Sequence, residues 1–201
     1  MKKALLIVSV AVFGLSFGGG EQAVSTFTDK RDGKVYRIVQ IGSQVWFAEN
    51  LNYAAKGSKC YDNKAANCAK YGRLYDWATA LKACPAGYHL PTDKEWTALE
   101  DYAGGEKNAG KKLKSKAGWN NNGNGTDDYG WSALPGGGGL DDGSFKDASN
   151  AGSWWSATED VAYGARLWLM YYEFNDVPWF NTDKTNLCSV RCVQDDKEAK
   201  K

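Results

Sequence analysis

The feature that most limits how this 201-residue chain can fold is its set of five cysteines: Cys60, Cys68, Cys84, Cys188 and Cys192. Zinc ligation does not fit them, because no Cys-x2-Cys pair occurs and His89 is the only histidine. In an oxidising compartment the same residues predict disulfides. Their odd number leaves one thiol without a partner.

The N-terminus indicates that the chain is exported. Lys2 and Lys3 precede an apolar run over residues 4–13, and small residues follow up to Gly20. A positive end, a short apolar segment and a small-residue exit are typical of a signal peptide, which we place at residues 1–20. The run is too short to span a bilayer, and the exit has no cysteine for a lipid anchor. We expect a secreted, periplasmic or cell-surface protein whose mature form has no transmembrane segment.

The composition indicates one globular domain and argues against nucleic-acid binding. The 25 basic and 24 acidic residues give a formal net charge of +1, so no basic field is available to attract phosphates. Nine Trp, 11 Tyr and 23 Gly are typical of a domain in which large aromatic side chains anchor ordered loops. We place a short N-terminal segment at residues 21–26, the domain at residues 27–195 and a charged tail at residues 196–201.

Several segments have the composition of strands or ordered loops. Residues rich in β-branched and aromatic side chains predict four strand regions: 26–51, 154–158, 165–174 and 189–193. The polar stretch 54–70 predicts a loop. The Gly- and Asn-rich stretch 118–152 also predicts a loop, and its anchors Trp119 and Trp131 indicate that this loop is ordered. We expect most Trp side chains in the core, with Trp179 the most exposed.

Two helices are predicted among these strands. The first ends before Pro85 and carries four apolar residues on one face: Leu74, Trp77, Ala78 and Leu81. The second begins at a capping box, Thr92 to Glu95, and buries three residues: Trp96, Leu99 and Tyr102. The basic run at residues 111–116 is interpreted as the solvated end of a helix. Together the elements predict an α+β fold.

Ordered motifs along the chain resemble the Fibrobacter succinogenes major paralogous domain, a group of bacterial exported or surface proteins. The motifs are RDGKVY at residues 31–36, IGSQVW at 41–46, YGRLY at 71–75, GYHLP at 87–91, ALPGG at 133–137, WSATE at 155–159 and SVRCV at 189–193. They cover residues 27–195, which is nearly the whole expected mature chain.

The resemblance implies a C-type-lectin-like fold, akin to the domain of formylglycine-generating enzymes. Such a fold has two helices packed on small antiparallel sheets, long ordered loops, and chain ends that lie close together. Activity across the family is poorly defined, so the resemblance bears on fold more than on function.

With this fold we expect two disulfides, Cys60 with Cys68 and Cys84 with Cys192. Closing a loop of about 100 residues with the second stabilises the fold by roughly 4–5 kcal/mol in the entropic model. We expect Cys188 and Cys192 four residues apart on one strand, which is too distant for a direct bridge. Cys188 is therefore predicted to be a spare thiol.

The function we expect is that of an exported, non-catalytic binding module that recognises a glycan or a surface protein through its long-loop face. Four loop residues are the candidate ligand-binding site: Asp127, Asp128, Asp142 and Trp179. Alanine at these positions is expected to weaken ligand binding and to leave thermal stability nearly unchanged. His89 is expected to have a structural hydrogen-bonding role, because no nucleophile signature accompanies it.

Three alternatives stay open. The first is a calcium site with Asp127 and Asp128 as ligands, since carboxylate oxygens suit this ion. The chain lacks the Glu-Pro-Asn and Gln-Pro-Asp triplets of many calcium-binding lectins. A formylglycine-generating-like enzyme is a second possibility, and it is disfavoured because no second thiol can be placed with Cys188 beside a substrate groove. A purely structural cell-surface protein is the third. No further cofactor is predicted.

Overall fold

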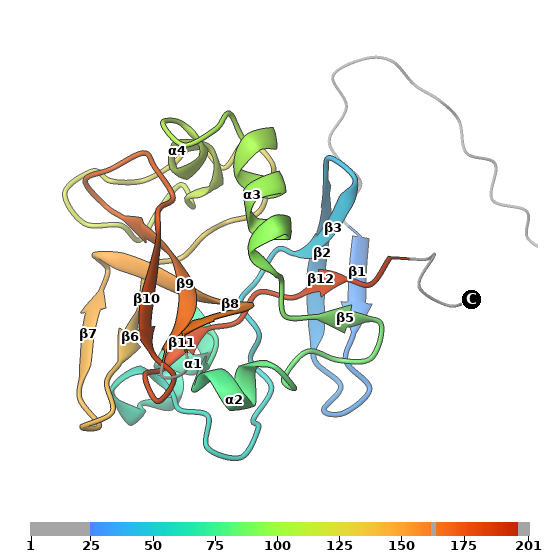
Figure 1. Ribbon diagram of the computed structural model, residues 1–201, viewed down its shortest axis with the longest axis vertical. Helices are drawn as coiled ribbons and strands as arrows, with labels where there is room; N and C mark the ends of the chain where they lie inside the picture. Colours follow the sequence, from blue (N-terminus) through green and yellow to red (C-terminus); the bar gives the residue numbers. More distant parts are fainter. Residues whose placement is uncertain (1–24, 162–163, 197–201) are drawn as a thin grey trace, which may run out of the picture.

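The computed structural model describes residues 25–161 and 164–196, and within them the chain has a mixed α+β fold built on two sheets (Figure 1). The predicted signal peptide at residues 1–20 lies outside the described residues, as do most of the segment 21–26 and residues 197–201 of the tail. No helix in the described ranges is both long enough and apolar enough to cross a membrane.

The first sheet has five strands in the order β1-β2-β3-β12-β5, all paired antiparallel. Its strands are β1 (Ser25–Thr28), β2 (Val35–Ile41), β3 (Gln44–Phe47), β5 (Tyr88–His89) and β12 (Val193–Gln194). The predicted strand region 26–51 supplies the first three. Because β12 lies at the other end of the described chain, this sheet brings the two ends of the fold together, as Figure 1 shows.

The second sheet is mixed, whereas only small antiparallel sheets were expected. Its order is β10-β9-β8-β11-β4, and β6 pairs with both β7 and β8. Its strands are β4 (Leu74–Tyr75), β6 (Gly136–Gly139), β7 (Phe145–Ala148), β8 (Ala151–Val161), β9 (Gly164–Tyr171), β10 (Trp179–Asp183) and β11 (Cys188–Ser189). Strands β6 and β11 run parallel to β8. Neither is joined to β8 by a tight hairpin, which would require antiparallel pairing.

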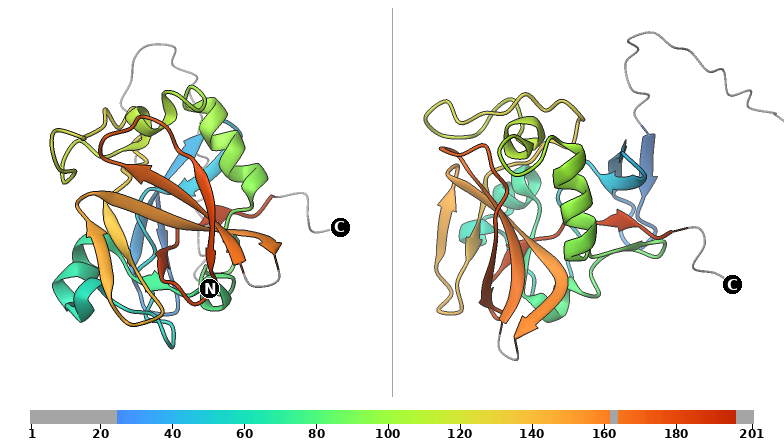
Figure 2. Two further views of the ribbon diagram at one scale, coloured as in Figure 1. Left: turned by 60° about the vertical axis from the view of Figure 1, so that its left-hand side comes forward. Right: turned by 45° about the horizontal axis from the view of Figure 1, so that its top comes forward.

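The described residues contain four α-helices and one 3₁₀ helix, where two helices were expected. They are η1 (Tyr61–Asn63), α1 (Ala65–Tyr71), α2 (Trp77–Ala80), α3 (Asp93–Tyr102) and α4 (Ala109–Leu113). The turned views in Figure 2 show α3 alongside the strands of the second sheet. Only α3 exceeds two turns, so most of the helical structure consists of short connections between strands.

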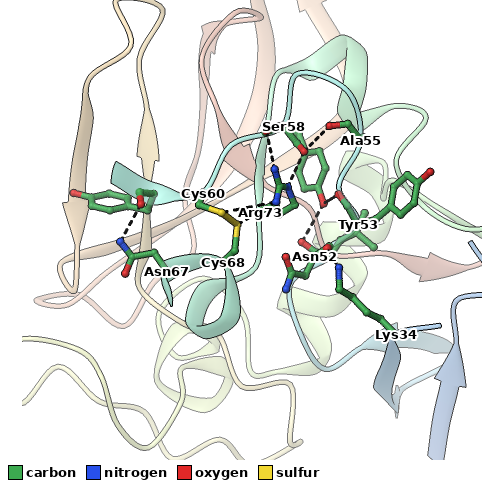
Figure 3. Close-up of a disulfide and its surroundings, with 12 residues drawn as sticks. Lys34, Asn52, Tyr53, Ala55, Ser58, Cys60, Asn67, Cys68 and Arg73 are labelled. Atoms are coloured by element: carbon green, nitrogen blue, oxygen red, sulfur yellow. Dashed lines mark hydrogen bonds between the residues drawn. A yellow bond between two sulfur atoms is a disulfide. The ribbon is translucent and has the colours of Figure 1, made fainter. Parts of the chain in front are cut away.

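The stretch 54–70 contains η1 and α1, so its prediction as a loop was wrong. The predicted loop 118–152 is irregular only in part, because it contains β6 and β7. The disulfide between Cys60 and Cys68 closes the stretch 54–70 into a compact unit. Figure 3 shows Arg73 beside the disulfide, where its guanidinium donates to the Ser58 carbonyl oxygen at 3.0 Å and to the Ser58 hydroxyl at 2.8 Å. These contacts tie the disulfide-closed segment to the start of β4.

The first predicted helix is much shorter than expected. Leu74 is a buried residue of β4, and Leu81 is exposed. The carboxylate of Asp76 accepts a hydrogen bond from the Thr79 amide at 2.7 Å, which makes Asp76 the N-cap of α2. A capping residue fixes where a helix begins, so Leu74 cannot belong to this one.

The second predicted helix is confirmed as α3. The Thr92 hydroxyl accepts a hydrogen bond from the Glu95 amide, and the Glu95 carboxylate accepts one from the Thr92 amide, so the capping box is present. Trp96 and Leu99 are buried as expected, but Tyr102 is 55% exposed. The Tyr102 ring lies on the surface and packs against Tyr129 with ring centroids 5.6 Å apart.

The C-terminal segment passes from one sheet to the other. Residues 190–192 separate β11 of the second sheet from β12 of the first, so Cys188 and Cys192 do not share the strand predicted over 189–193. Cys192 is in the expected disulfide with Cys84, and Cys188 is a buried free thiol. Residues 190–192 are not paired as a strand because they connect one sheet to the other.

Six buried tryptophan side chains belong to one of the two core clusters, which confirms that most Trp residues lie in the core. Trp46, Trp96, Trp131 and Trp154 are all at most 1% exposed and pack against one another. Trp96 also stacks on Trp168 with ring centroids 5.6 Å apart. Contacts of this kind stabilise a core beyond the simple burial of apolar area.

Truncation of Trp96 should therefore be costly. The change Trp96→Ala is expected to lower the free energy of unfolding by about 3–5 kcal/mol, because the surrounding indole rings cannot collapse into the cavity. Denaturant unfolding measures this loss. The matched control is Lys94→Ala on the exposed side of the same helix, which should change stability by less than about 0.5 kcal/mol. Equal effects of the two variants would contradict the role given to Trp96.

The single histidine joins three parts of the chain. His89 Nδ1 lies 2.8 Å from a carboxylate oxygen of Asp195, and Nε2 lies 2.7 Å from one of Glu95. The hydrogen bond with Glu95, together with that from Asp195, raises the pKa of His89 to about 9. The contacts agree with the expected hydrogen-bonding role.

This raised pKa predicts a pH dependence of stability. Protonated His89 stabilises the fold fully below its ordinary pKa of 6.5, and the stabilisation is lost as pH rises through about 9. The variant His89→Gln should therefore lose more stability relative to wild type at pH 6 than at pH 9.5. Urea unfolding at both pH values tests this, and an equal loss at the two would contradict it.

Candidate functional site

A pocket of about 480 Å³ opens where the first part of the long loop meets the turn that follows β9. It lies between residues 121–124 and 172–175, with Lys111 at one side. Both segments belong to the loop-rich part of the molecule near α4, at the top of Figure 1. We call this site the amide pocket, because four of its lining residues are asparagines: Asn121, Asn122, Asn124 and Asn175.

The side chains of the amide pocket combine aromatic rings with polar groups. Phe174 is 55% exposed, and the half-buried Tyr172 lies beside it in the lining. The Tyr172 hydroxyl donates to the Glu173 carboxylate at 2.9 Å, and this hydrogen bond raises the pKa of the phenol. Among the described residues, the side-chain amides of Asn122 and Asn175 have no hydrogen-bond partner. They are therefore available to a ligand.

The loop that carries the asparagines is held by close backbone contacts. A Cβ atom on Gly123 would lie 2.4 Å from the Tyr172 carbonyl oxygen, and one on Gly125 would lie 2.1 Å from that of Lys114. No other residue fits at these two positions without a shift of the backbone. The Asn124 side chain accepts a hydrogen bond from the amide of the buried Trp119 at 3.0 Å. The loop is thus fixed against its neighbours.

A buried lysine fixes the opposite wall. Lys114 is 1% exposed, so the interpretation of residues 111–116 as a solvated helix end was wrong at this position. Its Nζ atom donates to the carbonyl oxygens of Tyr171 at 3.1 Å and Phe174 at 2.7 Å. It also lies 5.2 Å from the centroid of the Trp119 ring. Lys114 is buried because these carbonyls turn inward and need a donor.

Burial also changes the pKa of this lysine. Desolvation lowers the pKa of Lys114 to about 8. Through its hydrogen bonds and its contact with the Trp119 ring, Lys114 joins the turn 171–174 to the end of α4 and to the long loop. The two walls of the amide pocket are held together before any ligand is bound.

The comparison with family models covers this region, the whole second sheet and the first sheet from the end of β2 onward. The model described as the Fibrobacter succinogenes major domain matches residues 39–194. The chain belongs to this family. No significant match was found among curated proteins, and none among solved structures. The amide pocket of this Fibrobacter succinogenes major domain lies wholly within the matched residues.

The predicted site residues of this major domain are not brought together. Asp127 lies in a separate groove, where its carboxylate accepts from the Ser132 amide at 2.7 Å and from the Ser132 hydroxyl. Asp128 is exposed, and its amide donates to the Lys112 carbonyl oxygen at 2.9 Å. Neither residue lines the amide pocket.

The other two predicted residues lie elsewhere. Asp142 is in the turn between β6 and β7, at the opposite end of Figure 1 from α4, and accepts from the Ser144 amide at 2.8 Å. Hydrogen bonding to the Ser144 side chain, together with that from the Ser144 amide, lowers the pKa of the Asp142 carboxyl group. Trp179, 46% exposed, has the Arg166 guanidinium 4.0 Å from its ring centroid. One face of the indole is thus already covered.

Whether side chains of the described residues could together coordinate a metal ion depends on how their ligand groups are arranged. No group of three or more His, Cys, Asp or Glu side chains within residues 25–161 and 164–196 is arranged to hold one. The carboxylate of Asp127, a residue considered for calcium, is engaged by Ser132. The chemistry available in the amide pocket is hydrogen bonding and aromatic packing.

Sequence reasoning missed the residues that form the amide pocket. The run of asparagines at 120–122 was a visible signal, but asparagine is also an ordinary turn residue. Tyr172 and Phe174 were assigned to a predicted strand over 165–174, whereas β9 ends at Tyr171. Their exposure becomes evident only once that strand end is known.

Proposed function

We propose that this protein is an exported, non-catalytic binding module of C-type-lectin-like fold that recognises a glycan through the amide pocket. The proposal rests on one observation: exposed Phe174 and half-buried Tyr172 line the same pocket as the unpartnered side-chain amides of Asn122 and Asn175. Aromatic rings pack against the apolar faces of sugars, and amides hydrogen-bond to sugar hydroxyls.

The rigidity of the amide pocket supports a binding role. Lys114 and the close contacts at Gly123 hold the two walls in position, so little conformational entropy is lost when a ligand binds. The two disulfides, together with the signal-peptide pattern at residues 1–20, support export, because disulfides persist in oxidising compartments.

The state of the cysteines supports a binding role over formylglycine-type chemistry. Cys188 is fully buried, and burial raises the pKa of its thiol to about 12, so the reactive thiolate is scarce at neutral pH. The four remaining cysteines are in disulfides. Paired thiols at an open groove are thus missing from the described residues. A purely structural role makes no use of an open pocket with unpartnered amides.

A glycan array tests the proposal. The oxidised protein should bind a distinct set of glycans, and Phe174→Ala should weaken that binding by about tenfold, which corresponds to roughly 1.4 kcal/mol for one aromatic platform. Asn175→Ala should weaken it as well, while both variants keep the thermal stability of wild type. The matched control is Phe180→Ala, because Phe180 is 49% exposed on β10 outside the pocket.

Three outcomes would contradict the proposal. The first is an array on which the protein binds no glycan. The second is equal loss of binding in Phe174→Ala and Phe180→Ala. The third is glycan binding that neither pocket variant changes, which would locate the site elsewhere on the molecule.

A further inference from the structure

A second and larger depression lies on the other side of the long loop. This groove, of about 570 Å³, is lined by β2, by residues 48–52, by the end of α1 and by residues 115–117. We call it the basic groove, because four cationic side chains line it and only two carboxylates do. The cations are Lys34, Arg37, Lys70 and Lys116, and the carboxylates are Glu49 and Asp127.

Two of the four cations are already paired. Arg37 contacts Glu49 at 3.2 Å, and Lys34 contacts Asp32 at 3.1 Å. Figure 3 shows the Lys34 side chain directed at Asn52, where its ammonium donates to the main-chain carbonyl oxygen. These two side chains shape the wall of the groove formed by β2 and the loop after β3.

The other two cations are available to a ligand. Lys70 and Lys116 are exposed, and neither has a carboxylate partner among the described residues. Lys70 lies over the Tyr71 ring, 4.6 Å from its centroid, which holds its ammonium at the groove. Lys70 comes from α1 and Lys116 from the short segment between α4 and the long loop, so the two lysines reach the groove from different segments.

A buried charge lies directly behind the groove. Asn50 lines the groove, and its side-chain oxygen accepts from the guanidinium of Arg191 at 2.8 and 3.1 Å. Arg191 is 0% exposed and forms no ion pair within the described residues. A cation in a poorly polarisable interior projects its field toward the nearest opening. Of the two carboxylates at the groove, Glu49 is paired with Arg37, whereas Asp127 keeps its negative charge because its partner Ser132 is neutral. The two lysines without a carboxylate partner, Lys70 and Lys116, therefore outnumber the one carboxylate without a cationic partner.

We infer that the basic groove binds an acidic sugar, a saccharide that carries a carboxylate, with Lys70 and Lys116 contacting the carboxylate and the Asn52 side-chain amide contacting hydroxyl groups. Asn52 is half-buried in the groove, and its side chain has no hydrogen-bond partner among the described residues. The inference is independent of the amide pocket, which shares no residue with this groove.

An acidic peptide suits the groove less well than an acidic sugar. Strand β2 pairs with β1 over residues 35–38 and with β3 over residues 38–41. Beside the groove, the Arg37 carbonyl oxygen accepts from the Ala48 amide and the Arg37 amide donates to the Glu49 carboxylate, so little of this edge is left for an added strand. The amides of Ala48, Leu51 and Asn52 donate within the protein, to Arg37, Val190 and the Tyr36 hydroxyl respectively. A peptide backbone therefore finds few partners here, whereas side-chain groups remain for a sugar.

Binding of polygalacturonate to the oxidised full chain tests the inference. Calorimetric titration at low salt should show binding, and fully methyl-esterified polygalacturonate, which has the same backbone without the charge, should not bind. The double variant Lys70→Gln, Lys116→Gln should bind polygalacturonate about tenfold more weakly. The matched control is Lys82→Gln, Lys94→Gln, which removes the same charge from exposed positions outside the groove and should change affinity less than twofold.

Several results would overturn the inference. They are the absence of polygalacturonate binding, equal binding of the esterified polymer, equal loss in the two double variants, or binding of polyglutamate as tight as that of polygalacturonate. Phe174→Ala in the amide pocket should leave polygalacturonate binding unchanged. Failure of the basic groove is thus distinguishable from failure of the proposed glycan site.

Discussion

The interaction on which the rest of this fold depends is a set of hydrogen bonds from a buried guanidinium that forms no ion pair with any described residue. Arg191 lies in the segment that crosses between the two sheets, and it donates to the carbonyl oxygens of Phe47, Trp131 and Ser132 and to Asn50. Asn50 in turn accepts from the Trp154 indole at 2.8 Å. One side chain thereby joins the first sheet, the long loop and the second sheet. Its burial lowers the pKa of Arg191 to about 9, which reflects the cost of desolvating the charge.

A second buried cation has the same role near α4, where Lys114 donates to inward-facing carbonyl oxygens of the turn after β9. Long loops place backbone carbonyls in the interior that no helix or strand can satisfy, and each needs a donor. A buried cation supplies several donors from one point. The long loop is held at both places, by Arg191 on one side and by Lys114 on the other. The basic groove and the amide pocket lie beside these two points, so each has at least one wall fixed by the fold.

Signals that act within a few residues were predictable from the sequence. The capping box at Thr92 marked the start of α3, and most indoles could be assigned to the core, with Trp179 expected at the surface. The predictions that were wrong concern residues whose structure depends on contacts with distant parts of the chain. Leu74 has a helical spacing with Trp77 but pairs with the C-terminal strand β11, and Lys114 stands in a basic run but meets carbonyls near residue 174. The amide pocket was missed for the same reason, since Asn122 and Phe174 are brought together only by the fold.

The central claim is that Arg191 holds the two sheets and the long loop together in spite of its desolvation. The most direct test is the free energy of unfolding of Arg191→Met, which removes the charge and keeps an unbranched apolar side chain. The carbonyl oxygens of Phe47 and Trp131, both buried, and the part-buried one of Ser132 then lose this donor, while the Asn50 side-chain oxygen keeps only the Trp154 indole as a donor. The account therefore predicts a loss of about 3–5 kcal/mol in denaturant unfolding. A variant as stable as wild type, or more stable, would contradict the claim, because the desolvation of the guanidinium would then outweigh its hydrogen bonds.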